Sequence, residues 1–142
     1  TEVAKFYYKH IDKPLAFIFT RYSIIDENET ILPSYKDDAT PNIVNPELHA
    51  KISFFWGCLP GNISNVSLFK STIKEFGYFN EELKVSGDFE YWYRTTAKLS
   101  IGYIHEHNFY IRTHSNQLSR NLNSTYLSII EDLSIIIGFQ KR

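Results

Sequence analysis

The chain has 142 residues, which suits a single domain, and 43% of them are hydrophobic, a content ample for a packed core. Its formal net charge is −1 with both signs mixed along the sequence, so there is no basic stripe and nothing favours nucleic acid as a partner. Cys58 is the single cysteine, which excludes an intrachain disulfide and a Cys-x-x-Cys metal site. No signal-peptide pattern starts at Thr1, and Met excision or a cut from a longer protein would each explain this start.

The first half of the chain predicts one helix and two strands. Apolar residues at helical spacing indicate a helix over residues 2–12, which ends before Pro14. The run from Leu15 to Tyr22 barely alternates, which is typical of a strand covered on both faces. After it the sequence predicts, in order, a turn at 24–30, a short strand at 31–35, a surface loop at 36–48 and an irregular, glycine-containing loop at 52–62.

The second half alternates strands with helices. Residues 63–69 alternate like a strand, Ser71 is a candidate cap for the short helix that follows, and Gly77 is placed to end that helix. The remaining predicted elements are a helix over about 88–99, strands at 101–105 and 109–112, and a C-terminal helix with an apolar stripe from 126 to 137. This alternation indicates an α/β fold.

The stretch SGDFEYWYR, residues 86–94, places a carboxylate at the start of an aromatic helix. Asp88 has two interpretations: it caps the helix, or it faces a cleft and accepts a proton from a substrate hydroxyl. A helix start favours the ionised form of Asp, which suits a base. We expect Glu90 to be solvated, and Trp92 to be a core residue more than a platform for a sugar.

Two segments carry a resemblance to a known family. Residues 61–94 and 101–120 resemble the C-terminal half of a family-two, GT-A-fold glycosyltransferase. The matching pieces, in order, are Phe69-Lys70 after a strand, the turn from Gly77 to Leu83, Asp88 before a helix with Trp92 and Arg94, and a Tyr-x-Arg-x-His element of Tyr110, Arg112 and His114 with Ser119 downstream. Residues 16–32 also resemble the strand and turn that follow the family's metal-binding motif, so the resemblance covers most of residues 1–120.

The resemblance implies a GT-A-like α/β fold, a Rossmann-like mixed sheet with flanking helices, present as its acceptor-side C-terminal portion. Asp88 corresponds to the catalytic base of the family's Glu-Asp motif, with Gly87 in place of the Glu. The implied reaction is an inverting transfer of a sugar from a nucleoside diphosphate to an acceptor hydroxyl. The family uses a divalent metal, Mg or Mn, held by an Asp-x-Asp motif. Nothing before Leu15 fits that motif, and the Asp37-Asp38 pair lies in the wrong place.

The resemblance also assigns binding residues. Arg112, His114 and Ser119 would bind the diphosphate, where Arg offers planar, charge-assisted donors. The acceptor-side wall would comprise Trp56, Gly61, Asn62 and Trp92. Simpler interpretations stay open: Arg112 as a surface ion-pair partner, His114 as a loop residue bonded to backbone, and the glycines as ordinary turn residues. His105 and His107 lack a third ligand and make a poor metal site.

By the same resemblance, the partners are a nucleotide-sugar donor and a glycan or lipid-linked acceptor. The setting would be bacterial assembly of a surface polysaccharide in the cytoplasm, peripheral to the inner membrane. Glu131 and Asp132 interrupt the C-terminal apolar stretch, so it is too charged to span a bilayer. Leu127 and Ile135 lie outside its stripe and would pack on the missing half, a partner subunit or a membrane surface. Two rival classes remain: a non-catalytic carbohydrate-binding or interaction module, and an unrelated small domain in which Asp88 is only a cap.

Overall fold

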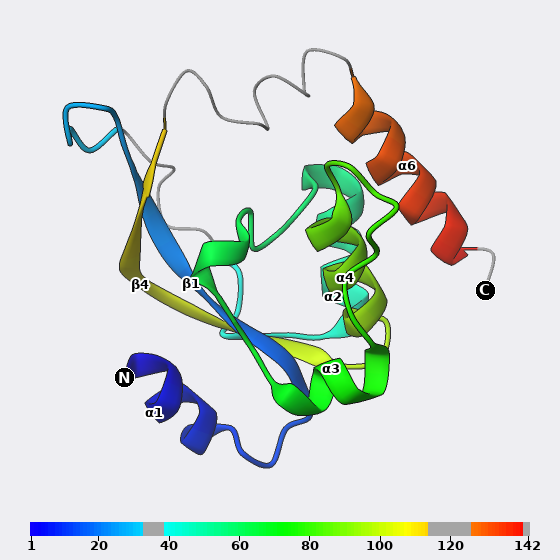
Figure 1. Cartoon of the computed structure of the whole chain (residues 1–142). Coiled ribbons are helices and arrows are strands. Elements are labelled where there is room, and N and C mark those ends of the chain that lie inside the picture. The colour runs from blue at the N-terminus through cyan, green and yellow to red at the C-terminus, as the bar shows by residue number, and fades with distance from the viewer. Residues whose placement is uncertain (33–38, 114–125, 141–142) are drawn as a thin grey trace.

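A computed structural model of the chain describes residues 1–32, 39–113 and 126–140 (Figure 1). Within these residues, four strands form one mixed sheet in the order β2-β4-β1-β3. The two long strands, β1 (Leu15–Ile25) and β4 (Ser100–Arg112), run parallel, while β3 (Val66–Leu68) pairs antiparallel with β1 and β2 (Ile43–Val44) antiparallel with β4. Helices flank this sheet, which confirms the predicted α/β class.

Helix α1 (Glu2–Lys9) lies on one side of the sheet, and α2 (Pro46–Trp56) and α4 (Gly87–Thr96) lie on the other (Figure 1). Phe6 of α1 packs against a small buried cluster that includes Ile18 and Ile104. Gly102 of β4 allows this approach, because a Cβ there would lie 2.6 Å from the Phe6 ring.

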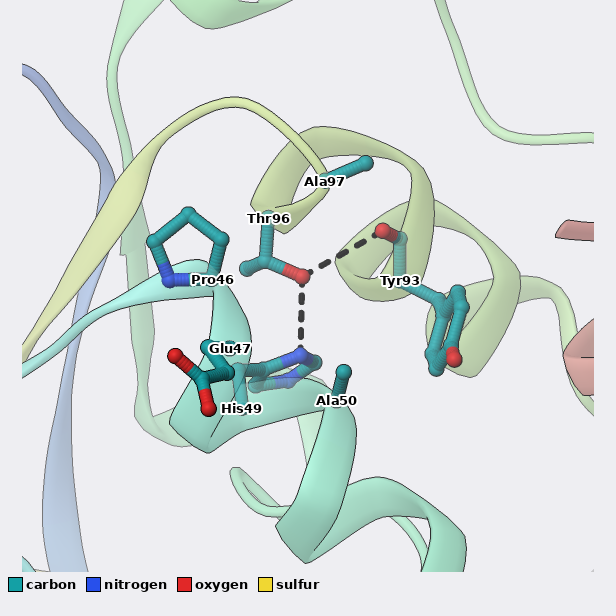
Figure 2. Close-up of a pocket in the computed structure, with 7 residues that line it drawn as sticks. All are labelled: Pro46, Glu47, His49, Ala50, Tyr93, Thr96 and Ala97. Carbon is teal, nitrogen blue, oxygen red and sulfur yellow. Dashed lines mark hydrogen bonds between the residues drawn. The ribbon is translucent and has the colours of Figure 1, made fainter. Parts of the chain in front are cut away.

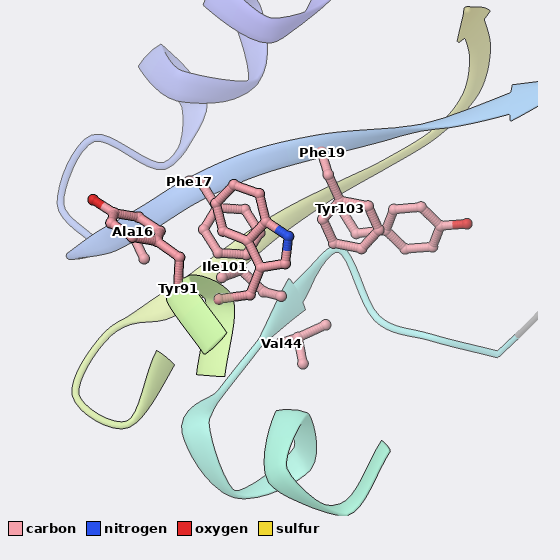
Figure 3. Close-up of a cluster of buried hydrophobic side chains, with 8 residues drawn as sticks. Ala16, Phe17, Phe19, Val44, Tyr91, Ile101 and Tyr103 are labelled. Carbon is pink, nitrogen blue, oxygen red and sulfur yellow. The ribbon is translucent and has the colours of Figure 1, made fainter. Parts of the chain in front are cut away.

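The main core lies between the sheet and α2 and α4 (Figure 3). The ring centroids of Phe17 and Trp92 are 4.5 Å apart, and Phe19 stacks on Tyr103 at the same separation. Residues 15–20 of β1 are all buried, on both faces, as the unbroken apolar run predicted. Aromatic pairs of this kind add to the stability that burial alone provides.

The loops predicted at 36–48 and 52–62 are wrong where they overlap α2. Asn45 is the N-cap of this helix, and its Oδ1 accepts a hydrogen bond of 2.8 Å from the N–H of Leu48. Pro46 occupies the first turn, where its missing N–H costs nothing. Gly57 then ends the helix at a φ of 82°. The Asn45-Pro46 pair is typical of a helix start, but the many polar residues around it also suit a loop, and a loop was predicted.

Several other predicted elements differ from the observed ones by a few residues at their ends. The strand predicted at 63–69 is a 3-10 turn, η1 (Ile63–Asn65), followed by the three residues of β3. Helix α3 (Lys70–Phe76) starts after Phe69, not at a Ser71 cap, and ends at Gly77 as predicted, where φ is 81°. The two strands predicted near the end are one strand, β4. Of the strand predicted at 31–35, Ile31 forms an isolated bridge to Ile25, and 33–35 lie outside the described residues.

Helix α6 (Leu127–Gln140) packs along α4 (Figure 1). Ile135 and Ile136 are buried against Phe89, so the prediction that left Ile135 outside the packed stripe is wrong. The exposed residues are instead Ile129, Ile130, Leu133 and Ile137. The isoleucines and leucines of α6 lie on several sides of the helix, so periodicity alone does not specify its buried face. In the described part of the chain, no helix combines the length and the apolar character needed to cross a membrane.

Candidate active site at the start of helix α4

The first turn of α4 carries Asp88. The helix begins at Gly87 with Ser86 as its N-cap, so Asp88 is not the cap residue that one interpretation expected. Its Oδ1 accepts a hydrogen bond of 2.8 Å from the N–H of Phe89, one of the first-turn donors that have no partner inside the helix. Asp88 is partly buried.

Helix α6 brings a second carboxylate group to the turn before α4. Glu131 Oε1 accepts from the N–H of Lys84 at 3.0 Å, and Oε2 accepts from the N–H groups of Val85 and Ser86 at 3.0 and 2.9 Å. Burial opposes the charged form of Glu131, but these three hydrogen bonds and the Lys84 charge outweigh it and lower its pKa. Hydrogen bonds to a charged acceptor are among the stronger ones in proteins.

Asp132 and Cys58 complete an acidic cluster around Asp88. Burial raises the pKa of Asp132 most, a hydrogen bond from the Ser86 side chain lowers it, and the charges of Asp88 and Glu131 raise it further. Burial also raises the pKa of the Cys58 thiol to about 12, with additional effects from Asp88 and Asp132. Cys58 is therefore protonated and not a nucleophile at neutral pH. The cluster joins α4, α6 and the loop after α2.

That loop, residues 57–62, holds two of the predicted acceptor-side residues, Gly61 and Asn62, and follows a third, Trp56, at the end of α2. Gly61 has a φ of 72°, and a Cβ there would lie 2.8 Å from the hydroxyl of Tyr22, so only glycine fits. Asn62 caps η1 by accepting from the N–H of Ser64. The Trp56 side chain at the end of α2 is 79% exposed, and its ring is available to a ligand.

Trp92 and Glu90 lie away from solvent. Trp92 is 1% exposed and packs against Phe17, which agrees with its interpretation as a core residue and leaves no ring face for a sugar. The prediction that Glu90 is solvated is wrong, because its carboxylate forms a two-point ion pair with Arg94 at 2.8 and 3.1 Å. Arg94 also donates to the carbonyl oxygens of Phe76 and Tyr78, which ties α4 to the end of α3.

Of the predicted diphosphate-binding residues, the structure describes only Arg112, and its contacts are with the turn after β1. Arg112 lies at the end of β4, and its guanidinium donates to the Asp26 carbonyl at 3.1 Å and to Glu29 Oε1 at 3.0 Å. This matches the alternative interpretation of Arg112 as an ion-pair partner. His114 and Ser119 lie outside the described residues, as do Asp37 and Asp38. Where the structure describes the chain, no three His, Cys, Asp or Glu side chains are grouped to hold a metal.

A separate cavity of about 320 Å³ lies between α2 and the end of α4 (Figure 2). His49 is 2% exposed at its wall, and its Nδ1 lies 2.8 Å from the hydroxyl of Thr96. Thr96 donates its single proton to the Trp92 carbonyl at 2.7 Å, so we assign the proton of the neutral imidazole to Nδ1. Burial lowers the pKa of His49 to about 4. Sequence reasoning did not identify this pair.

Sequence reasoning also missed the groups that surround Asp88. Their common feature is that each comes from a segment distant in sequence: Cys58, Glu131 and Asp132. One signal was available, because two adjacent acids interrupt an otherwise apolar helix. A buried or half-buried acid in an apolar run needs a partner, and here the partners are backbone N–H groups and a serine hydroxyl.

Comparisons with known proteins assign no family or function to the chain. No family model matches the chain, and no curated protein matches it.

Proposed function

We propose that this chain is the acceptor-side portion of an inverting, GT-A-like glycosyltransferase in which Asp88 is the general base. The observation that carries the proposal is the position of Asp88 in the first turn of α4, partly exposed and near enough to Cys58 of the 57–62 loop for its charge to raise the pKa of that thiol. The ordered similarity of residues 61–94 and 101–120 to that family supports it. The mixed sheet flanked by helices is compatible with such a fold.

In the proposed reaction, Asp88 accepts the proton of the acceptor hydroxyl. The hydroxyl oxygen forms a bond to the anomeric carbon of the donor sugar while the bond from that carbon to the diphosphate oxygen breaks on the opposite face. The products are the glycoside, a nucleoside diphosphate and a protonated Asp88. General-base assistance of this kind is worth about 10²–10⁴-fold in rate. The 57–62 loop, with Gly61 held against Tyr22, would form one wall for the acceptor.

A divalent metal is part of the family's chemistry, but the described residues do not fit one. They contain no group of three or more His, Cys, Asp and Glu side chains close enough to act as ligands. The acids near Asp88 are engaged in hydrogen bonds to backbone N–H groups and to Ser86. We therefore route no step of the proposed reaction through a metal held by these residues.

A second candidate function is carbohydrate binding without transfer. The observation that favours it is the exposed Trp56 ring at the edge of an apolar cavity of about 520 Å³, which Pro41, Leu48 and Ile52 also line. Exposed aromatic rings next to concave surfaces are common in ligand sites. This candidate needs no base, and it predicts that Asp88 can be replaced without functional loss.

The experiment that separates the two functions uses the protein at its full length with nucleoside diphosphate sugars and measures release of the nucleoside diphosphate. We expect Asp88→Asn to reduce release by about 10²–10⁴-fold while donor binding is kept. Asp12→Asn, an exposed acid after α1, is the matched control and should retain the wild-type rate. Full transfer by the Asp88→Asn protein would defeat the assignment. Glycan binding without any release would favour the second candidate.

A further inference from the structure

The C-terminal helix α6 docks at the segment that precedes Asp88. Glu131 is its polar anchor, and its two carboxylate oxygens accept three hydrogen bonds of 2.9 to 3.0 Å from the consecutive N–H groups of residues 84–86. Ile135 and Ile136, one turn further along α6, are buried against Phe89. The contact therefore has a polar part at the lead-in to α4 and an apolar part on its first turn.

The lead-in turn has no other capping group of its own among the described residues. Ser86 is the N-cap residue of α4, but its side chain makes no capping hydrogen bond. Its hydroxyl is directed to Asp132 instead. Asp88 supplies one acceptor, to the N–H of Phe89. Glu131 thus takes the place that a local Ser, Thr or Asp side chain usually fills at a helix start, and it does so from 45 to 47 residues away.

The same docking sets the charge around Asp88. Asp132 follows Glu131 directly, and its pKa is raised by burial and by the neighbouring charges of Asp88 and Glu131. The other titratable group that faces the cluster is Cys58, whose thiol is protonated at neutral pH. No Lys or Arg contributes to the pKa of Asp132 in the described part of the chain. Helix α6 therefore both fixes the start of α4 and contributes an acid beside it.

We propose that Glu131 is a positioning residue for Asp88: by holding the N–H groups of residues 84–86, it fixes the turn from which Asp88 projects. This inference rests on the proposed function. It assigns α6 a role in the reaction although Glu131 does not touch the substrate. Small displacements of a reacting group are costly, with a shift of about 1 Å reducing the rate by as much as about 10²-fold.

The first test is independent of any activity and uses the 142-residue chain. In amide NMR spectra of the wild type, we expect the N–H signals of residues 84–86 to be protected from exchange with water, and the Phe89 N–H signal to report its hydrogen bond to Asp88 Oδ1 by shifting in Asp88→Ala, which removes that acceptor. Glu131→Gln keeps the size of the side chain but replaces one acceptor oxygen with an NH₂ donor. It should remove the protection and also perturb the Phe89 signal. Glu81→Gln, an exposed acid of the same loop, is the control and should change neither.

The second test uses the full-length protein and its transfer rate. We expect Glu131→Gln to lower kcat by about 10-fold to 100-fold with little change in the KM for the acceptor, because positioning of the base acts on the chemical step. Glu131→Asp, which keeps both acceptor oxygens on a shorter stem, should recover part of kcat.

The two tests separate the possible failures. If Glu131→Gln frees residues 84–86 but leaves the Phe89 signal and kcat unchanged, Glu131 only anchors α6 and the positioning role is wrong. If Asp88→Asn keeps full transfer, the proposed function fails, and the Phe89 signal still decides whether Glu131 orients Asp88. A fall in kcat that merely tracks a loss of folded protein, measured by thermal unfolding of the same samples, would also overturn the inference.

Discussion

The two ends of α4 satisfy their polar groups in different ways. At the C-terminal end, Arg94 is paired with Glu90, and Thr96 is bonded to both His49 and a backbone carbonyl. At the N-terminal end, burial and the charges of Asp88 and Glu131 raise the pKa of Asp132, so acids of like charge lie near one another there. The difference teaches that one end of the helix is arranged for stability and the other retains unfavourable charge, which is common where a site binds or reacts.

This comparison predicts that substitutions at the C-terminal end change stability most. Arg94→Ala leaves the largely buried Glu90 carboxylate unpaired and removes two hydrogen bonds to the end of α3. We expect a loss of about 3–5 kcal/mol in the free energy of unfolding, measured by denaturant titration. Lys74→Ala, at an exposed position of α3, is the control. A loss below about 1 kcal/mol for Arg94→Ala would show that the network contributes little.

The buried His49 predicts a dependence of stability on pH. Its pKa in the folded state, about 4, lies below the ordinary value of 6.5, so the unfolded chain binds the proton first as the pH falls. Its contribution is therefore complete above about pH 6.5 and is lost progressively down to about pH 4, for a total of about 3 kcal/mol. Thermal or urea unfolding across this range should show a steeper loss for the wild type than for His49→Gln. Parallel pH profiles for the two proteins would contradict the assignment.

Asp132 predicts an effect of the opposite sign at the other end of α4. Its folded-state pKa is raised, so its charged form destabilises the fold above that pKa, and stability is recovered as the pH falls through it. Asp132→Asn keeps an acceptor for Ser86 and removes the charge. We expect it to stabilise the chain at pH 7 by up to about 1 kcal/mol, with a gain that shrinks in acid. If Asp132→Asn is less stable than the wild type at pH 7, the hydrogen bond from Ser86 outweighs the cost of burying the Asp132 charge, and the prediction is wrong.

The smallest expected change in stability belongs to Asp88 itself. Asp88→Asn retains an oxygen that can accept from the Phe89 N–H, so the free energy of unfolding should change by no more than about 0.5 kcal/mol. Combined with the large loss of transfer expected for the same variant, this result would separate a functional carboxylate from a helix cap. A stability loss of about 1–2 kcal/mol would instead show that the Asp88 carboxylate stabilises the start of α4 as much as an N-cap residue does.

Local patterns predicted part of the fold well. The apolar run of β1 and the glycine that ends α3 were readable, because burial on two faces and a positive φ each leave a signature in a few adjacent residues. Helix α2 was missed although Asn45 and Pro46 mark its start, because the polar residues around them also suit a loop. The single long strand β4 was divided in two, since its second half is exposed and carries polar residues.

Of the residues of the candidate site, the sequence predicted Asp88 but not the groups that surround it. Asp88 could be selected because it begins an aromatic helix within a recognisable order of motifs. Arg112 was expected beside it, yet the tertiary structure directs its guanidinium to the turn after β1. Periodicity predicted the packed face of α6 only in part: Ile136 lies in the predicted stripe and is buried, but Ile135, which was placed outside that stripe, is buried beside it.

The sequence by itself determined the α/β class, the doubly covered strand β1 and the position of Asp88 near a helix start, because these depend on residues that are neighbours in the chain. Only the tertiary structure decided which groups surround that carboxylate. Cys58 and Asp132 reach it from 30 and 44 positions away in the printed numbering, and Glu131 caps the turn before it from α6. Such contacts depend on how α4 and α6 pack. That packing joins side chains that are far apart in the sequence, so a pattern of neighbouring residues does not predict it.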